Sequence, residues 1–302
     1  MLQHRAVFLR QIRSFFERRG VLEVETPCLL RATASDTHLE SFELRGGESR
    51  YLQTSPGFAM KRLLAAGSGP IYQLCKCFRR GESSSRHNPE FTMLEWYRPG
   101  FDQALLMAEA ASLVTELLDI DNFETHTYQQ LFERCIGLNP HLASDAELAQ
   151  VAQSRLDFQA QAMARTDWLD LLMSHLVEPQ LSGAVFICEF PWQQASLSRI
   201  VNNSEGQPVA SRFELYIDGL EIANGYHELL DAEELQRRAD IDNAQRLDCG
   251  LPEIPLDSHL LAAHQHGLPP CAGVAVGVDR LLMIKTGVAN IDQVLAFSER
   301  RL

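Results

Sequence analysis

The stretch Phe91-Thr92-Met93-Leu94-Glu95-Trp96-Tyr97 is the most informative part of this sequence of 302 residues. Its aromatic and apolar composition is typical of a β-strand, and successive side chains of a strand point to opposite faces. Phe91, Met93, Glu95 and Tyr97 are therefore expected on one face. In an isolated strand, a Tyr and a Glu on one face would most often be a solvent-exposed pair. The preceding segment changes that interpretation.

Arginines are concentrated immediately before this strand. Residues 71–80 are predicted to form a second strand, and the polar loop 81–90 joins the two. The loop and the end of that strand supply Arg79, Arg80, Arg86, His87 and Asn88. Guanidinium groups bind phosphate oxygens in a fixed geometry, and fixed donors stabilise charge on a transferring group. The segment therefore predicts a site for nucleotide phosphates.

A hairpin is predicted further along the chain, at Asp218-Gly219. This dipeptide is a strong signal for a two-residue turn, and strands are expected over residues 213–217 and 220–223. In that register Tyr216 faces Glu221 and Glu214 faces Ala223, so Glu214 and Glu221 are diagonal neighbours on one face. Two such carboxylates repel each other, and they suit Mg²⁺ shared with substrate phosphates. A solvent-facing pair is the alternative.

The same register divides the polar residues of this region between two faces. Strict alternation puts Asn224, Tyr226 and Glu228 on the face opposite Glu221. They can join one site with Glu221 only if a β-bulge near Ala223 shifts the alternation by one residue. The sequence does not show such a bulge.

Small residues dominate the segment Gly273-Val274-Ala275-Val276-Gly277-Val278-Asp279-Arg280. It is predicted to form a strand over residues 273–278 that runs into a final helix. Glycine in a strand lets a ligand or another backbone approach closely, and Arg280 would bring a permanent positive charge. Tight packing of the sheet would explain the glycines equally well.

The rest of the chain favours an α+β fold. Val7, Ile12, Phe15 and Phe16 share a helical face in residues 1–19, and Gly20 offers a stop. Helices are also expected over residues 103–118, 128–135, 145–152, 167–176 and 232–247, a strand over 184–190 and an edge strand over 21–27. His264 and His266 are expected in a solvated turn. Helices inserted between strands favour an antiparallel sheet flanked by helices, and residues 1–302 are expected to form a single domain.

Composition limits the possible partners. The formal net charge is −13. Such a surface repels a polyanion, because Lys and Arg contacts to phosphates supply most non-specific nucleic-acid affinity, so tRNA is not expected as a partner. The seven cysteines lack a disulfide framework spacing, which indicates reduced thiols and a cytoplasmic location. No apolar run approaches the ~18 residues of a membrane span.

Considered together, four segments resemble the catalytic core of a class II lysyl-tRNA synthetase. Residues 20–27 resemble motif 1, residues 78–95 resemble motif 2 of the lysyl branch, and residues 273–280 resemble motif 3. Residues 222–229, Ile-Ala-Asn-Gly-Tyr-His-Glu-Leu, are similar to the lysine-pocket segment. The resemblance implies an antiparallel sheet flanked by helices, the use of ATP and Mg²⁺, and a homodimer built through motif 1.

The resemblance also implies roles for individual residues. Arg79 would hold the α-phosphate of ATP and Arg280 the γ-phosphate, both acting in catalysis, and Phe91 would stack on adenine. Glu214 and Glu221 would hold Mg²⁺. Further nucleotide contacts are expected from Arg80, Gly81, Glu82, His87, Asn88, Glu221, Ile222 and Gly277. The lysine would be enclosed by Ser55, Pro56, Gly57, Glu95, Tyr97, Asn224, Tyr226, Ala275 and Glu228, with Glu228 facing its side-chain ammonium.

The position of motif 1 points to one branch of this family. Lysyl-tRNA synthetases carry an anticodon-binding domain ahead of the core, and here that domain is expected to be absent. Among truncated relatives the chain is most similar to ligases that activate lysine, preferably (R)-β-lysine, and attach it to a lysine of elongation factor P. Ala275, where the synthetase usually has Gly, and residues 190–197 fit this branch.

Two positions depart from the family pattern. Gly57 stands where the family supplies a carboxylate to the substrate amino group, and Gly81 stands where motif 2 has Glu, although Glu82 follows. These changes give weight to a non-catalytic, synthetase-like regulatory subunit. A lysine ligase acting on tRNA or on a small molecule is a further alternative. An AMP-forming ligase is favoured, because a mere binding module needs no full set of catalytic residues; that set is Arg79, Glu214, Glu221, Glu228 and Arg280.

Overall fold

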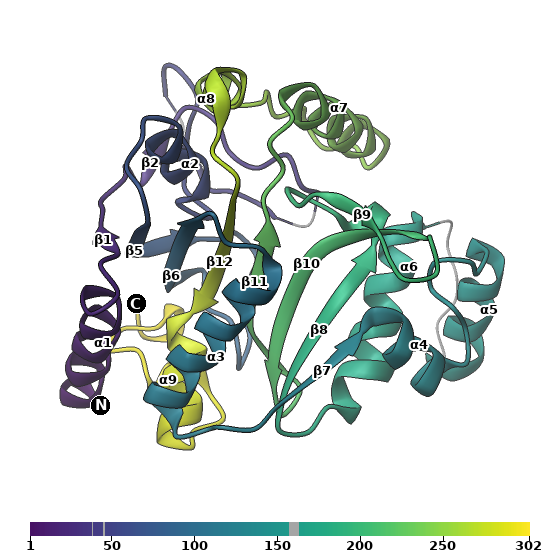
Figure 1. The fold of residues 1–302 in the computed structure, drawn as a ribbon, viewed down its shortest axis with the longest axis horizontal. Helices are drawn as coiled ribbons and strands as arrows, with labels where there is room; N and C mark the ends of the chain where they lie inside the picture. Colours follow the sequence, from purple (N-terminus) through teal and green to yellow (C-terminus); the bar gives the residue numbers. More distant parts are fainter. Residues whose placement is uncertain (38, 45, 157–162) are drawn as a thin grey trace.

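The computed structural model describes residues 1–37, 39–44, 46–156 and 163–302. Within these residues, nine strands form one central sheet (Figure 1). Most of them lie in the order β1 (Leu22–Glu23), β5 (Ile71–Phe78), β6 (Glu90–Pro99), β12 (Cys271–Gly277), β11 (Leu220–His227), β10 (Pro208–Ile217), β8 (Ala184–Pro191) and β7 (Phe123–Thr127). The remaining strand, β9 (Ile200–Asn202), pairs with β10. A small second sheet contains β2 (Leu29–Leu30), β4 (Arg50–Leu52) and β3 (Glu43–Leu44).

The centre of the main sheet is antiparallel, which confirms the expected α+β architecture. At its two ends, however, β1 pairs with β5 and β7 pairs with β8 in parallel. Parallel neighbours need a long crossover. The first crossover contains α2 (Gly57–Ala65), and the second contains α4 (Tyr128–Ile136), α5 (Asp145–Leu156) and α6 (Arg165–Leu172). The edge strand expected over residues 21–27 is present at the edge but only as the two residues of β1.

The helices pack in three groups (Figure 1). α1 (Leu2–Glu17), α3 (Gln103–Leu118) and α9 (Val278–Thr286) share one hydrophobic core with the centre of the sheet. α4, α5 and α6 form a second core against β8. α7 (Ala232–Asp248) and α8 (Ser258–Gly267) pack on each other, and α8 also packs on α2. Short helical turns lie at Met173–Val177, Glu178–Gln180, Trp192–Gln194, Ile291–Gln293 and Glu299–Arg301.

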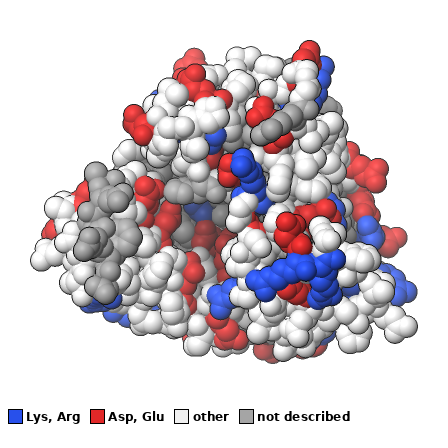
Figure 2. All heavy atoms as spheres, turned by 180° about the vertical axis from the view of Figure 1, so that it is seen from behind, with Lys and Arg blue, Asp and Glu red and all other residues white. Residues whose placement is uncertain are grey.

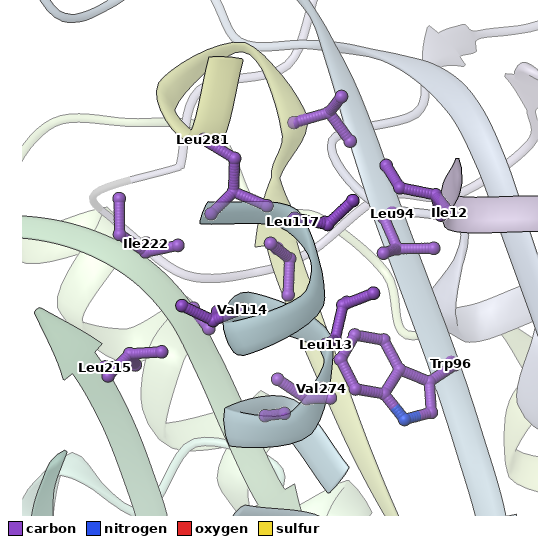
Figure 3. Close-up of a cluster of buried hydrophobic side chains, with 14 of the residues drawn as sticks. Ile12, Leu94, Trp96, Leu113, Val114, Leu117, Leu215, Ile222, Val274 and Leu281 are labelled. Carbon is purple, nitrogen blue, oxygen red and sulfur yellow. The ribbon is translucent and has the colours of Figure 1, made fainter. Parts of the chain in front are cut away.

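The main core covers one face of the sheet. Leu94 and Trp96 of β6 and Val274 of β12 meet the helix α3 in Figure 3. On β6 these residues alternate with Glu95 and Tyr97, which therefore point to the opposite face. Burial of apolar surface fixes the strand in one register, since a slip by one residue would expose Trp96 and bury charge in this core. Core packing thus determines which residues can reach the other face.

The first helix differs from expectation at one position. Ile12, Phe15 and Phe16 are buried as predicted, but Val7 is 44% exposed and Phe8 is buried instead. Phe8 lies four residues before Ile12, on the same helical stripe, whereas Val7 lies beside it. Gly20 adopts a left-handed φ of +64° just after the helix, consistent with its predicted role as a stop.

Two further expectations are corrected. The helix expected over residues 167–176 is present but changes type, because α6 ends at Leu172 and a π-helical turn continues it over Met173–Val177. His264 is not in a solvated turn: it lies in the last turn of α8 and is 5% exposed. Residues 103–118, by contrast, form a helix with the expected bounds. Among the described residues, no helix combines the length and the apolar character needed to cross a membrane.

Candidate active site

Two rows of side chains cross four neighbouring strands on the face opposite the main core. Direct neighbours in the strand register form the first row, which is Glu95, Ala275, Asn224 and Glu214. The second row lies two residues away from the first on each strand, and it consists of Tyr97, Gly273, Tyr226 and Arg212. Positions two apart on a strand share a face. The rows therefore form one continuous polar floor.

A β-bulge allows β11 to contribute to this floor. Tyr216 pairs with Glu221 as expected, but Leu215 pairs with Ala223, which leaves Ile222 as an extra residue. Glu214 consequently faces Asn224, and the predicted pairing of Glu214 with Ala223 is wrong by one residue. Ile222 is 2% exposed because it packs into the main core (Figure 3). The shift brings Asn224, Tyr226 and Glu228 to the face of Glu221, as the conditional prediction required.

A cavity of about 870 Å³ lies over the floor. Its lining includes every predicted site residue except Pro56, Arg80 and Gly81. Figure 2 shows that the molecule is hollowed on the side opposite the view of Figure 1, with acidic and basic side chains close together around the hollow. A cavity lined by both charge signs suits a ligand that itself carries separate positive and negative groups.

Three predicted residues lie outside the cavity lining. Arg80 points away and donates from Nη1 to Glu40 Oε1 at 3.0 Å, with its side chain 63% exposed. Gly81 has a left-handed φ of +81° in the loop after β5. Pro56 precedes the first residue of α2 and serves as its N-cap. Their contribution to substrate binding stays a prediction.

Arg280 is held at one end of the cavity. Its Nη1 donates to the backbone oxygen of Glu221 at 2.6 Å, and its Nη2 lies 2.6 Å from His87 Nε2. Burial lowers the pKa of His87, and Arg280 lowers it further. The neutral ring can accept from Arg280 at Nε2 while Nδ1 donates to Ser84 Oγ at 2.8 Å. Ser84, which the sequence did not single out, thereby orients His87 and Arg280.

Arg79 and Phe91 adjoin this end. The guanidinium of Arg79 lies 5.1 Å from the centre of the Phe91 ring, and its Nη1 lies 3.6 Å from Glu82 Oε1. Its buried Nε has no hydrogen-bond partner among the described residues. A buried donor without a partner costs free energy, so this nitrogen is suited to an anionic ligand. Asn88 also lines the cavity, but its side chain bonds the backbones of Glu90 and Glu299.

Carboxylates gather beside Arg280. Glu214 accepts from Arg212 and, at 2.7 Å, from the Tyr216 hydroxyl, which is also 3.2 Å from Glu178 Oε1. Burial raises the pKa of Glu214 to about 7, and the charge of Glu221 adds to the rise although Arg212 opposes it. Burial, with Glu221, also raises the pKa of Glu178. Arg212 pairs with Glu214 and Arg280 lies 3.5 Å from Glu221, so three carboxylates share these two guanidinium groups.

The excess charge fits a divalent cation. Glu214 and Glu221 lie on one face of the hairpin, as predicted, and carboxylate oxygens are the ligands that Mg²⁺ takes together with phosphates and water. In the described part of the chain, no cluster of three or more His, Cys, Asp or Glu side chains has the geometry of a metal site. Glu214 and Glu221 would supply two carboxylates to such an ion, and substrate and solvent would fill the other positions of its octahedral shell.

The opposite end of the cavity contains Glu95. Its Oε1 accepts from the Tyr97 hydroxyl at 2.6 Å and its Oε2 from Ser55 Oγ at 2.7 Å. Ser55 Oγ in turn accepts from the backbone N–H of Gly57 at 2.9 Å. Burial raises the pKa of Glu95, and these hydrogen bonds oppose the rise. There is no room for a side chain at Gly57, because a Cβ there would lie 2.6 Å from Glu95 Oε1.

Glu228 is paired with a residue that sequence reasoning missed. Lys61 Nζ lies 2.7 Å from Glu228 Oε2, and the two side chains are 3% and 1% exposed. Burial raises the pKa of Glu228 to about 7, although Lys61 lowers it. A signal was present in the sequence, because Lys61 lies between Met60 and Leu64 on the apolar face of α2. Charge on such a face indicates a buried partner.

The amino-acid sequence matches the model of a known family. A family model described as tRNA synthetases class II (D, K and N) matches residues 1–301. The chain therefore belongs to the class II tRNA synthetase family, which confirms the resemblance found in the sequence.

Within this family, similar proteins have a specific name. Elongation factor P--(R)-beta-lysine ligase of Pseudoalteromonas translucida is 50% identical over 99% of this chain and 95% of its own length. Proteins of the same name from Edwardsiella ictaluri and Enterobacter sp. are 47% and 46% identical over the same shares. The similarity thus covers nearly the full length of this chain and of each similar protein.

Proposed function

We propose that this protein is an AMP-forming ligase that activates (R)-β-lysine with ATP and transfers it to a lysine side chain of elongation factor P. The observation that carries the proposal is the charge order along the cavity. Arg79 lies against Phe91 and Arg280 follows the Gly277 end of β12, whereas the buried Glu95 and Glu228 lie toward Tyr97 and Gly273. A lysine with its carboxylate at the phosphates and its ammonium among the carboxylates matches this order. The names of the similar proteins support the same activity.

In the first step the carboxylate of lysine attacks the α-phosphorus of ATP. A bond forms between that oxygen and phosphorus, the bond to the bridging oxygen of the β-phosphate breaks, and pyrophosphate leaves. Arg79 and Arg280 stabilise the charge that develops on the phosphates, because their positions are fixed before the reaction. Glu214 and Glu221 would hold Mg²⁺, which when bound supplies further positive charge to the phosphates.

In the second step the amine of the acceptor lysine attacks the carbonyl carbon of the aminoacyl-adenylate. An amide bond forms, the bond between the carbonyl carbon and the phosphate oxygen breaks, and AMP leaves with its electrons while the nitrogen releases one proton to solvent. The amine must be neutral to attack, and an unperturbed Lys has a pKa of about 10.4. Desolvation of the acceptor at the cavity lowers that pKa, since burial disfavours the ammonium.

We also propose that the protein forms a homodimer. We place the contact at α1 and β1, where apolar side chains are exposed: Val7 is 44% exposed and Leu22 is 57% exposed. Association of two copies through this contact would cover these apolar side chains. Light scattering on the purified protein tests this directly, since Val7→Asp with Leu22→Asp is expected to halve the molar mass. A cytoplasmic location suits the seven cysteines, all of them in the described part of the chain and none in a disulfide.

Two alternatives make different predictions. A non-catalytic regulatory subunit would bind ATP or lysine without forming an adenylate. A lysine ligase with another acceptor would form the adenylate but transfer lysine to tRNA or to a small molecule. The net charge of −13 disfavours tRNA.

The test is ATP–pyrophosphate exchange with Mg²⁺ in the presence of (R)-β-lysine, α-lysine or no amino acid. Exchange that requires a lysine is expected, with (R)-β-lysine preferred, and no exchange with any amino acid would favour the regulatory subunit. Labelled (R)-β-lysine is then offered to elongation factor P, to elongation factor P with acetylated lysines, and to tRNA. Label on the unmodified factor alone is expected, whereas label on tRNA would assign the acceptor differently.

A further inference from the structure

A buried ion pair connects the first helix to the nucleotide end of the cavity. Arg5 of α1 donates from Nη1 to Asp279 Oδ1 at 2.6 Å and from Nη2 to Thr92 Oγ1 at 2.6 Å. The side chain of Asp279 is 3% exposed and that of Arg5 is 17% exposed. Arg5 is 274 positions from Asp279 and 87 from Thr92. Three distant segments of the chain therefore meet at one guanidinium.

Asp279 also completes the junction between two strands. Its Oδ2 accepts the backbone N–H of Thr92 at 2.6 Å. The pairing of β12 with β6 ends at Gly277 and Met93, because the chain then leaves the sheet to form α9. The carboxylate thus takes the place of the next backbone acceptor. Arg5 balances its charge and holds the Thr92 side chain as well.

The next residue on each segment belongs to the nucleotide end. Phe91 precedes Thr92 and lies against Arg79, while Arg280 follows Asp279 and bonds His87. We propose that Arg5 is a positioning residue for ATP, acting through Asp279 and Thr92 on Arg280 and Phe91. The proposal rests on the adenylate-forming activity proposed above.

Removal of the guanidinium has two consequences at this end. Asp279 lines the cavity, so without Arg5 its buried carboxylate would be an unbalanced negative charge close to the proposed phosphate site. In addition, the start of α9 would lose a constraint on Arg280. Neither consequence reaches Glu95 or Glu228 at the other end. The loss should therefore appear in ATP affinity and not in lysine affinity.

The test compares Arg5→Met, Arg5→Lys and the double variant Arg5→Met/Asp279→Asn. Arg5→Met is expected to raise the KM for ATP at least tenfold and to change the KM for lysine less than twofold. Arg5→Lys keeps the charge but not both hydrogen bonds, so it is expected to be intermediate. The double variant removes the unbalanced charge, so its KM for ATP is expected to be lower than that of Arg5→Met. Arg13→Met is the control, because Arg13 lies on the same helix and pairs with Glu23 at the surface.

Three readouts separate the outcomes: exchange kinetics, calorimetric titration with ATP, and thermal unfolding. Equal KM values for ATP in Arg5→Met and Arg13→Met would overturn the inference, as would equal losses toward ATP and lysine. If Arg5→Met does not fold, the KM values of Arg5→Lys for ATP and for lysine are compared with those of Arg13→Met instead. A wild-type protein without exchange or ATP binding would overturn the proposed function as well, whereas an active wild type with an unaffected Arg5→Met overturns only the positioning role.

Discussion

Lys61 and Glu228 form a buried ion pair in which Nζ lies 2.7 Å from Oε2. The pair balances one of the two carboxylates at the Tyr97 end of the cavity, whereas the other, Glu95, accepts hydrogen bonds from Ser55 and Tyr97. The Lys61 ammonium also lies 6.0 Å from the centre of the Tyr97 ring. Lys61 thus acts on both carboxylates, and a single ligand ammonium would balance the negative charge that is left when both are ionised.

Lys61→Met is expected to destabilise the protein. It leaves Glu228 buried without its cation, and breaking a buried pair in this way costs about 3–5 kcal/mol. Chemical denaturation should show the loss in the free energy of unfolding. Lys61→Met/Glu228→Gln removes both charges and is expected to recover most of it. A double variant no more stable than Lys61→Met would contradict the pairing.

The affinity for lysine is expected to rise with pH. Burial raises the pKa of Glu228 from 4.5 to about 7, so the folded protein retains a proton there that the unfolded chain has lost. The stability of the ligand-free protein should therefore fall as pH rises from about 4.5 to about 7, because the folded state binds more protons over that interval. An ammonium ligand prefers the ionised carboxylate, so its binding should improve over the upper part of that range.

The measurement is the KM for lysine in the exchange assay between pH 6 and pH 8.5. A decrease of several-fold is expected in the wild type, and Glu228→Gln should be weaker but nearly independent of pH. The same profile in both proteins would assign the titration to another group.

Glu214→Gln and Glu221→Gln are each expected to reduce Mg²⁺-dependent exchange at least a hundredfold. Each substitution replaces one of the two carboxylates available to the cation by a neutral amide of the same shape. Glu124→Gln on β7 is the matched control, because its side chain is 62% exposed and lies outside the cavity lining. The metal assignment fails if both cavity variants retain full activity across a titration with Mg²⁺.

Gly57→Ala is expected to weaken lysine binding about tenfold, the cost of about one hydrogen bond to a charged group. The new Cβ would lie 2.6 Å from Glu95 Oε1 and 2.8 Å from the Tyr97 hydroxyl, so the Glu95 carboxylate and the Tyr97 hydroxyl must both move. Tyr97 is a rigid ring and both residues are buried, so a decrease in thermal stability is expected as well. Kinetics with each substrate varied in turn check this, since an unchanged KM for lysine would show that the Glu95 network does not contact the substrate.

Much of the architecture could be predicted because alternation and helical period are local properties. The shared face of Phe91, Met93, Glu95 and Tyr97 follows from strand geometry alone. The bulge at Ile222 does not, since it depends on space in the core beneath α3. Arg5 escaped notice for a related reason: an Arg on an amphipathic helix is usually solvated, and only the tertiary fold brings Asp279 and Thr92 to it.

Ala275→Gly is expected to shift the substrate preference toward α-lysine. Ala275 lies between Glu95 and Asn224 in the first row of the floor, so its methyl group occupies the space between two polar side chains that line the pocket. Removal of one methyl group changes discrimination between close analogues by about tenfold. The ratio of kcat/KM for (R)-β-lysine and α-lysine should decrease accordingly. Ala272→Gly makes the same change on the same strand but in the main core, so it should lower stability and leave the ratio unchanged. An equal ratio in all three proteins would show that the methyl group of Ala275 does not select the isomer.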